Sequence, residues 1–82
     1  MKLLKFEASW CGPCKQLSEV MKGIDMPWPV AVIDIDKDRD TAIMYGVRGV
    51  PTLILMDEND NIVTRTTGAM NAETFKEKFG VA

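Results

Sequence analysis

The spacing of apolar residues changes along the chain, and these changes predict four strands. Residues 2–7 are apolar or alternate with charged residues, which is typical of a strand. Residues 30–35 form a short, mostly β-branched apolar run, which predicts a strand buried on both faces of a parallel sheet. Residues 52–56 and 62–67 predict two more strands, and the polar residues 57–61 between them predict an antiparallel hairpin.

Two stretches with helical spacing separate the first three strands. Pro13 suits the first turn of a helix, because its missing N–H costs nothing there. Apolar side chains follow at helical spacing as far as Gly23, where we expect this helix to end. A short second helix is expected around residues 42–45, with Asp36 or Asp38 as its N-cap and Gly46 at its end.

The last helix has the clearest boundary signals. Asn71 is a favourable N-cap, and Met70 before it is placed to pack on Phe75 as a hydrophobic staple. Phe75 and Phe79 are four residues apart and therefore lie on one face of the helix. Gly80 follows directly and can end the helix.

The resulting order is βαβαββα, which predicts an α/β fold in a single domain over residues 1–82. The first strand–helix–strand unit should be a parallel pair with a right-handed crossover, and the hairpin adds antiparallel pairing. We therefore expect a four-stranded mixed sheet with helices on both faces. A hydrophobic fraction of 46% in 82 residues is sufficient for the thin core of such a small domain.

Charge and hydropathy narrow the compartment and the partners. The net charge of −2 argues against nucleic acid or an anionic membrane surface as a partner. No stretch approaches the roughly 20 apolar residues of a membrane span. Lys5 and Glu7 interrupt the N-terminal leucines, so no signal peptide is recognised. We expect a cytoplasmic protein that binds neither membrane nor nucleic acid.

The chain has two cysteines and no histidine. This composition excludes the ordinary four-ligand structural zinc site and any mechanism that uses a histidine base. Two chains could share an iron–sulfur cluster, but nothing in the sequence requires one. We therefore expect no metal site.

The two cysteines, Cys11 and Cys14, flank a Gly-Pro pair where the first strand passes into the first helix. Unpaired N–H groups and the positive end of the helix dipole favour a thiolate at this position. We expect Cys11 to be exposed and to attack a substrate disulfide. Cys14, one turn into the helix, should face the core and resolve the mixed disulfide. The alternatives are an inert buried pair or half of a metal site, but cytoplasmic thiols are kept reduced, which favours catalysis.

Three blocks of sequence resemble the thioredoxin family. Residues 10–15 (Trp-Cys-Gly-Pro-Cys-Lys) are similar to its active-site signature, residues 45–52 to the segment before its cis-proline, and residues 67–69 to its last glycine turn. The similarity extends over about residues 2–80 and implies a thioredoxin-like fold. The chain resembles short thioredoxins, including those of bacterial viruses, that lack the extra N-terminal strand and helix. For a virus-encoded protein the expected compartment is the host cytoplasm.

The resemblance also implies a substrate-binding surface around Cys11. It implies that the Val50–Pro51 bond is cis, so that the backbone at Val50 can pair with an extended substrate segment. We expect an exposed apolar patch, which is typical of a protein-binding site, made of Trp10, Gly12, Pro13, Val50, Pro51, Gly68 and Ala69. Simple packing against the helix is an equally good interpretation for Trp10.

The chain departs from the family at Lys5. Thioredoxins usually bury an acid six residues before the nucleophile, and a lysine on the next strand where this chain has Val32. A charged Lys5 cannot accept the proton of the resolving cysteine, but it is a candidate modulator of the pKa of a nearby thiol. Glu7 or Asp34 could pair with it. We favour the simpler interpretation, in which the Lys5 side chain extends to solvent.

The resemblance implies a protein-disulfide reductase with no bound cofactor other than its redox-active disulfide. Electrons would come from NADPH through a flavin-containing thioredoxin reductase, and acceptors would include ribonucleotide reductase. We expect the protein to be a monomer.

Three other functions remain open from the sequence. A glutaredoxin-like enzyme would use glutathione, although glutaredoxins usually carry Pro-Tyr where this chain has Gly12-Pro13. A non-catalytic binding module of thioredoxin fold, such as a polymerase clamp, would tolerate loss of Cys11. An oxidase of secreted proteins is disfavoured by the Gly-Pro pair and the unrecognised signal.

Overall fold

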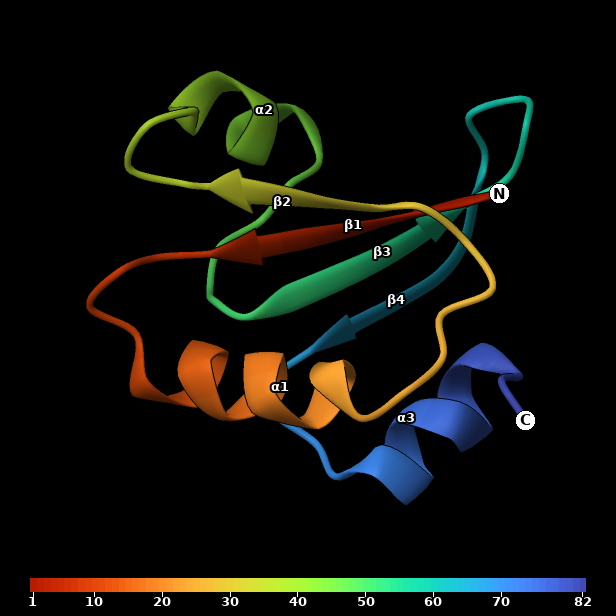
Figure 1. Ribbon diagram of the computed structural model, residues 1–82. Coiled ribbons are helices and arrows are strands. Elements are labelled where there is room, and N and C mark those ends of the chain that lie inside the picture. The colour runs from red at the N-terminus through yellow and green to blue at the C-terminus, as the bar shows by residue number, and fades with distance from the viewer.

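The computed structural model describes residues 1–82 and contains the seven expected elements in the expected order (Figure 1). They are β1 (Lys2–Glu7), α1 (Gly12–Lys22), β2 (Val30–Asp34), α2 (Arg39–Met44), β3 (Thr52–Met56), β4 (Ile62–Thr67) and α3 (Ala72–Phe79). The α/β class and the βαβαββα order are therefore confirmed. None of the three helices has the length and apolar character needed to cross a membrane.

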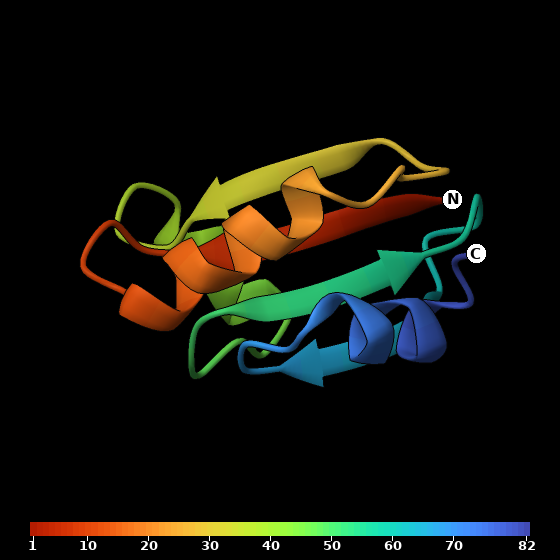
Figure 2. The same ribbon diagram turned by 60° about the horizontal axis from the view of Figure 1, so that its bottom comes forward.

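The four strands form one mixed sheet in the order β2-β1-β3-β4. Strands β1 and β2 are parallel, whereas β3 runs antiparallel to both β1 and β4. Figures 1 and 2 show α1 and α3 against one face of the sheet and α2 against the other. The expected mixed sheet with helices on both faces is confirmed.

The two central strands, β1 and β3, divide their side chains between two cores. Successive residues of a strand point to opposite faces. Leu3 of β1 therefore packs with Leu17 of α1 and Phe75 of α3, while Phe6 packs with Ala42 of α2 on the other face. Because both faces are covered, all five residues of β3 are buried.

The prediction that the second strand is buried on both faces is wrong. Strand β2 lies at the edge of the sheet, where Val30, Ala31 and Val32 are exposed and Val32 keeps 59% of its surface accessible. A nearly continuous apolar run does not reveal whether its strand lies at the centre or at the edge of the sheet. Here the central place beside β3 belongs to β1, so only Ile33 and the following Ile35 pack against a core cluster.

The antiparallel pairing of β1 and β3 brings two distant segments together. The end of β1 lies beside the start of β3, with Phe6 opposite Thr52. In Figure 1 both segments lie at the left, and the chain termini and the β3–β4 turn lie at the right. The β1–α1 loop and the turn before β3 therefore meet at one end of the sheet.

Candidate active site

Cys11 and Cys14 form a disulfide at the N-terminus of α1, with Cα atoms 5.3 Å apart. Cys11 is the N-cap residue, with extended backbone angles of φ −89° and ψ 107°. Its sulfur accepts a hydrogen bond from the backbone N–H of Cys14 at 3.1 Å. The positive end of the helix dipole and an N–H donor therefore both face Cys11 Sγ, an arrangement that favours the thiolate after reduction.

The expectation that Cys11 is exposed is wrong for this disulfide form. Only 4% of the surface of Cys11 is accessible, and Cys14 is buried as predicted. Ala8 is buried with the two cysteines, and Ile35 and Val50 pack against them. The position of Cys11 before the helix suggested exposure, but the chain around Val50, 39 residues away, covers the sulfur.

The Val50–Pro51 peptide bond is cis, as the resemblance implied. The carbonyl oxygen of Val50 is 3.7 Å from Cys11 Sγ. This is a van der Waals contact, because a disulfide sulfur carries no hydrogen to donate. The carbonyl of the next residue, Pro51, accepts a hydrogen bond of 2.8 Å from the N–H of Gly68. Gly68 has φ +100°, a conformation that favours glycine.

The residues expected around Cys11 differ in how much surface they expose. Trp10 is 67% exposed, and Gly12, Pro13 and Ala69 are exposed as well. Val50 and Gly68 are half-buried. Pro51, by contrast, is buried, so the expectation that its ring contributes exposed apolar surface is wrong. What Pro51 adds at this edge is a backbone without an N–H.

Asp36 is part of this site, although the sequence indicated only a helix cap for it. Its carboxylate accepts a hydrogen bond of 2.9 Å from the indole N–H of Trp10. The cap of α2 is Asp38, whose side chain accepts from the N–H of Thr41. No local signal separates the two aspartates, because the partner of Asp36 lies 26 residues away.

Lys5 does not extend to solvent, so the interpretation favoured from the sequence is wrong. The residue is 3% exposed, and its Nζ lies 2.5 Å from Oε1 of Glu7. Its ammonium also donates to the hydroxyl of Ser18, which in turn donates to the carbonyl of Cys14 at 3.0 Å. Of the two expected partners, the structure selects Glu7, because Glu7 lies two residues along the same face of β1.

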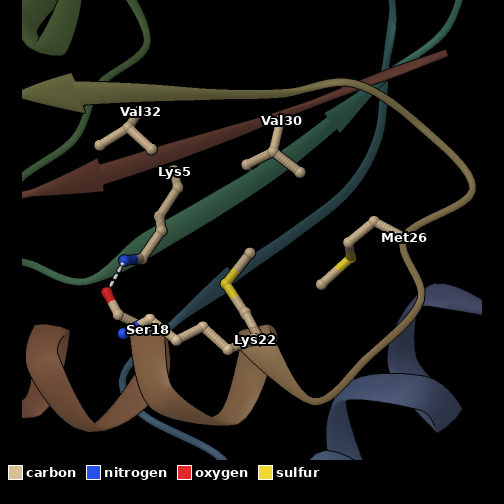
Figure 3. Close-up of a pocket in the computed structure, with 7 residues that line it drawn as sticks. Lys5, Ser18, Lys22, Met26, Val30 and Val32 are labelled. Atoms are coloured by element: carbon tan, nitrogen blue, oxygen red, sulfur yellow. Dashed lines mark hydrogen bonds between the residues drawn. The ribbon is translucent and has the colours of Figure 1, made fainter.

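The cavity in this structure does not lie at the disulfide. It is an open space of about 270 Å³ between α1 and β2, with Lys5 and Ser18 at its edge (Figure 3). Its remaining lining is mostly apolar and consists of Met21, Lys22, Met26, Val30 and Val32. The surface beside Cys11 is not a pocket, which suits a protein substrate better than a small molecule.

No cluster of three or more His, Cys, Asp or Glu side chains is arranged to hold a metal ion. The cysteines are joined to each other, and both sulfur atoms are therefore committed to the disulfide. The arrangement can undergo thiol–disulfide exchange: an attacking thiolate can open the bond, and its re-formation can reduce another disulfide.

Comparison with known proteins agrees with this chemistry. The thioredoxin family model matches residues 1–80. The thioredoxin of Bacillus subtilis (strain 168) is 33% identical over 79 residues, which are 92% of this chain and 75% of that protein. The thioredoxin of Pseudomonas aeruginosa PAO1 is 36% identical over 73 residues, 84% of this chain and 67% of that protein. A mutant thioredoxin from Halobacterium salinarum NRC-1 superposes with a TM-score of 0.83 at 37% identity, covering 93% of this chain and 68% of that one.

Proposed function

The chain belongs to the thioredoxin family and is a thiol–disulfide oxidoreductase that reduces protein disulfides, and from this premise we propose how its residues divide the work. Cys11 is the nucleophile, and Cys14 resolves the mixed disulfide. The observation that carries this assignment is the hydrogen bond from the Cys14 N–H to Cys11 Sγ at the N-terminus of α1. This hydrogen bond stabilises negative charge on Cys11 Sγ, so the activation of Cys11 does not depend on the sulfur of Cys14.

The exchange proceeds in two steps. The Cys11 thiolate attacks one sulfur of the substrate disulfide, and the other substrate sulfur leaves as a thiolate. The Cys14 thiol then gives its proton to solvent, and its sulfur attacks Cys11 Sγ, so that the mixed disulfide breaks and the remaining substrate sulfur leaves as a thiolate. The substrate departs with two reduced cysteines, and the chain keeps the Cys11–Cys14 disulfide seen here.

The substrate binds as an extended segment along the turn before β3. The contact between the Val50 carbonyl and Cys11 Sγ supports this placement, because a strand paired with that backbone would carry its disulfide to the sulfur. Trp10, Gly12, Pro13, Gly68 and Ala69 surround this position, with Val50 and the backbone of Pro51 at its centre. Trp10 is the largest exposed side chain among them and supplies most of the apolar contact.

A thioredoxin reductase that uses NADPH reduces the Cys11–Cys14 disulfide after each turnover. Oxidised proteins such as ribonucleotide reductase accept the electrons from this chain. The protein acts as a monomer in the cytoplasm, or in the host cytoplasm if a virus encodes it. The absence of a pocket at the disulfide supports a protein as reductant and as substrate.

The test is NADPH consumption with a disulfide-containing protein as substrate. One reaction contains thioredoxin reductase, and the other contains glutathione with glutathione reductase. We expect turnover with thioredoxin reductase alone. Turnover with glutathione alone would contradict the proposed electron donor, and no turnover in either reaction would contradict exchange with these reductants.

The roles of the two cysteines are tested with Cys14→Ser. Without the resolving thiol, Cys11 should remain joined to the substrate as a mixed disulfide that accumulates to one equivalent. A non-reducing gel and mass spectrometry detect this species. Release of reduced substrate at the normal rate would show that Cys14 is not the resolving residue.

A further inference from the structure

The ion pair between Lys5 and Glu7 has no part in the exchange steps above, yet it lies against the helix that carries both cysteines. The two charged atoms are 2.5 Å apart, and the same ammonium donates to the hydroxyl of Ser18 on α1. The Lys5 side chain is buried, whereas the Glu7 side chain is half-buried. The pair therefore forms a dipole whose positive end, the Lys5 ammonium, faces α1.

Ser18 connects this positive end to Cys14. Its hydroxyl donates to the Cys14 carbonyl at 3.0 Å while it accepts from Lys5 (Figure 3 shows the Lys5–Ser18 contact). Residues four apart are neighbours on one face of a helix, with Cβ atoms about 5–6 Å apart. Cys14 and Ser18 therefore share one face of α1, and the Lys5 ammonium meets that face at Ser18, one helical turn after Cys14.

Both cysteines are buried, so water does not solvate a thiolate at either one, and burial of an unpaired charge is costly. The two sulfurs differ in the backbone donor that faces them. The N–H of Cys14 donates to Cys11 Sγ. Because Lys5 is also shielded from water, salt screens its charge weakly.

We propose that Lys5, anchored by Glu7 and Ser18, is a positioning residue that stabilises the Cys14 thiolate during resolution of the mixed disulfide. This inference rests on the proposed function. The positive charge favours the reduced, ionised form of the cysteine pair over the disulfide, and it raises the equilibrium constant for reduction. Glu7 both holds Lys5 in place and offsets part of its charge.

Each element packed around Lys5 contributes a residue to its surroundings. Glu7 lies on β1, Asp34 faces Glu7 from β2, and Lys22 lies on α1 across the cavity. From β3, the apolar Leu53 faces Lys5. An unperturbed cysteine thiol has a pKa near 8.5, so the thiolate fraction, and with it the effect of the Lys5 charge, should be larger at pH 9 than at pH 5.5.

The experiment measures the equilibrium of the disulfide with reduced and oxidised glutathione at pH 5.5 and pH 9. Two glutathione thiols reduce Cys11–Cys14 and become one glutathione disulfide, so the reaction balances. We expect Lys5→Met to lower the equilibrium constant about tenfold at pH 9, which corresponds to about 30 mV, and less than twofold at pH 5.5. Glu7→Gln removes the offsetting charge and should raise the constant about threefold at pH 9.

Control variants separate the charge effect from damage to the fold. Lys5→Arg keeps the charge and should stay within about threefold of the wild type, and Lys2→Met removes an exposed lysine from the same strand and should change nothing. Circular dichroism shows which variants are folded. If Lys5→Met does not fold, the double change of Lys5→Met with Glu7→Gln removes both buried charges and should lower the constant by a smaller factor.

The signs decide the outcome. Opposite shifts for Lys5→Met and Glu7→Gln that grow with pH support the proposal, because a merely structural pair would disturb both variants in the same direction at every pH. Shifts of the same sign, shifts independent of pH, or unchanged constants would overturn it. A wild-type disulfide that fails to exchange with glutathione or with thioredoxin reductase would instead refute the proposed function.

Discussion

The N-termini of α1 and α3 use the same local device for different purposes. At each one, an extended N-cap residue accepts a hydrogen bond from the N–H three residues ahead: Cys11 from Cys14 at 3.1 Å, and Asn71 from Thr74 at 2.8 Å. On α3 the acceptor is an amide oxygen, and the bond only stabilises the helix. On α1 the acceptor is a sulfur, so the same partial charges also stabilise a nucleophile.

The residue before each cap differs in the same way. Met70 precedes the cap of α3 and packs against the core cluster that contains Phe75. Trp10 precedes the cap of α1, but it is exposed and is held by Asp36 rather than by the core. The N-terminus of α3 is therefore packed against the core, whereas that of α1 exposes its apolar residue to solvent. Helix capping by itself does not make a site; the identity of the capping atom and an open neighbour do.

The largest expected effect follows from replacing Cys11, whose sulfur caps α1. Cys11→Ser should abolish disulfide reduction, because a hydroxyl cannot form a disulfide, while α1 keeps its cap since serine is a favoured N-cap residue. Substrate reduction in the presence of NADPH and thioredoxin reductase measures the loss, and circular dichroism checks the fold. Residual turnover above background would show that the Cys11 sulfur at the N-terminus of α1 does not carry out the reaction.

Phe75→Ala should weaken the packing of α3 against the core without changing the rate of disulfide exchange. Phe75 is fully buried and stacks on Phe79 with ring centroids 4.7 Å apart, so its truncation should cost about 3–5 kcal/mol of unfolding free energy. Urea unfolding measures this loss. Glu77→Ala, an exposed change on the same helix, should stay within about 0.5 kcal/mol of the wild type. Equal losses for the two variants would contradict the packing of α3.

Trp10→Ala should weaken substrate binding and leave stability nearly unchanged. An exposed aromatic anchor at an interface contributes on the order of 1–2 kcal/mol, so KM for a protein disulfide should rise about tenfold with little change in kcat. Steady-state kinetics separates the two constants. Trp10→Phe is the matched control and should recover most of the binding. A variant with normal KM and lowered stability would place Trp10 with Met70, as a packing residue.

Asn71→Ala should cost about 1 kcal/mol of unfolding free energy, because the Thr74 N–H loses its partner. The rate of disulfide exchange should not change. Asn71→Ser retains an acceptor oxygen and should recover most of the loss. A lowered exchange rate in folded Asn71→Ala would mean that the two helix ends are coupled.

The smallest expected effect concerns Asp57, whose side chain accepts backbone hydrogen bonds in a turn rather than at a helix N-terminus. Backbone N–H groups of Asn61 and Asn59 in the β3–β4 turn bond the Asp57 carboxylate, chiefly that of Asn61, and hold its pKa below the ordinary 3.8. A lowered pKa means that this stabilisation is present above pH 4 and is lost as the pH falls through the folded value. As the pH falls from about 4.5 to 2.5, the unfolding free energy of Asp57→Asn should therefore decrease less than that of the wild type, as measured by urea unfolding. Identical acid profiles would contradict the contribution of this carboxylate.

Much of the fold could be predicted because its signals are local. The Asn71 cap, the Pro13 start of α1 and the left-handed Gly80 after α3 depend on residues within one or two helical turns. The cysteine pair is a local motif too, since its spacing and its place at a helix start are both visible in the chain. Such features are decided by backbone geometry that neighbouring residues share.

The errors concern features that depend on distant residues. The apolar run of β2 does not reveal that it borders solvent, and the place of Cys11 does not reveal that Val50 covers it. Arg65 of β4 donates to the carbonyls of Tyr45 and Gly46 after α2, a contact across about 20 residues that no pattern indicated.

The sequence by itself determined seven elements, their order and a reactive cysteine pair at a helix end, because periodicity and capping act between near neighbours. Only the tertiary structure decided which strand lies at the edge, what covers Cys11, and that Lys5 is buried against Glu7 and Ser18. Burial and ion pairing depend on which surfaces meet when the sheet and helices pack. That information is not contained in the spacing of residues along the chain.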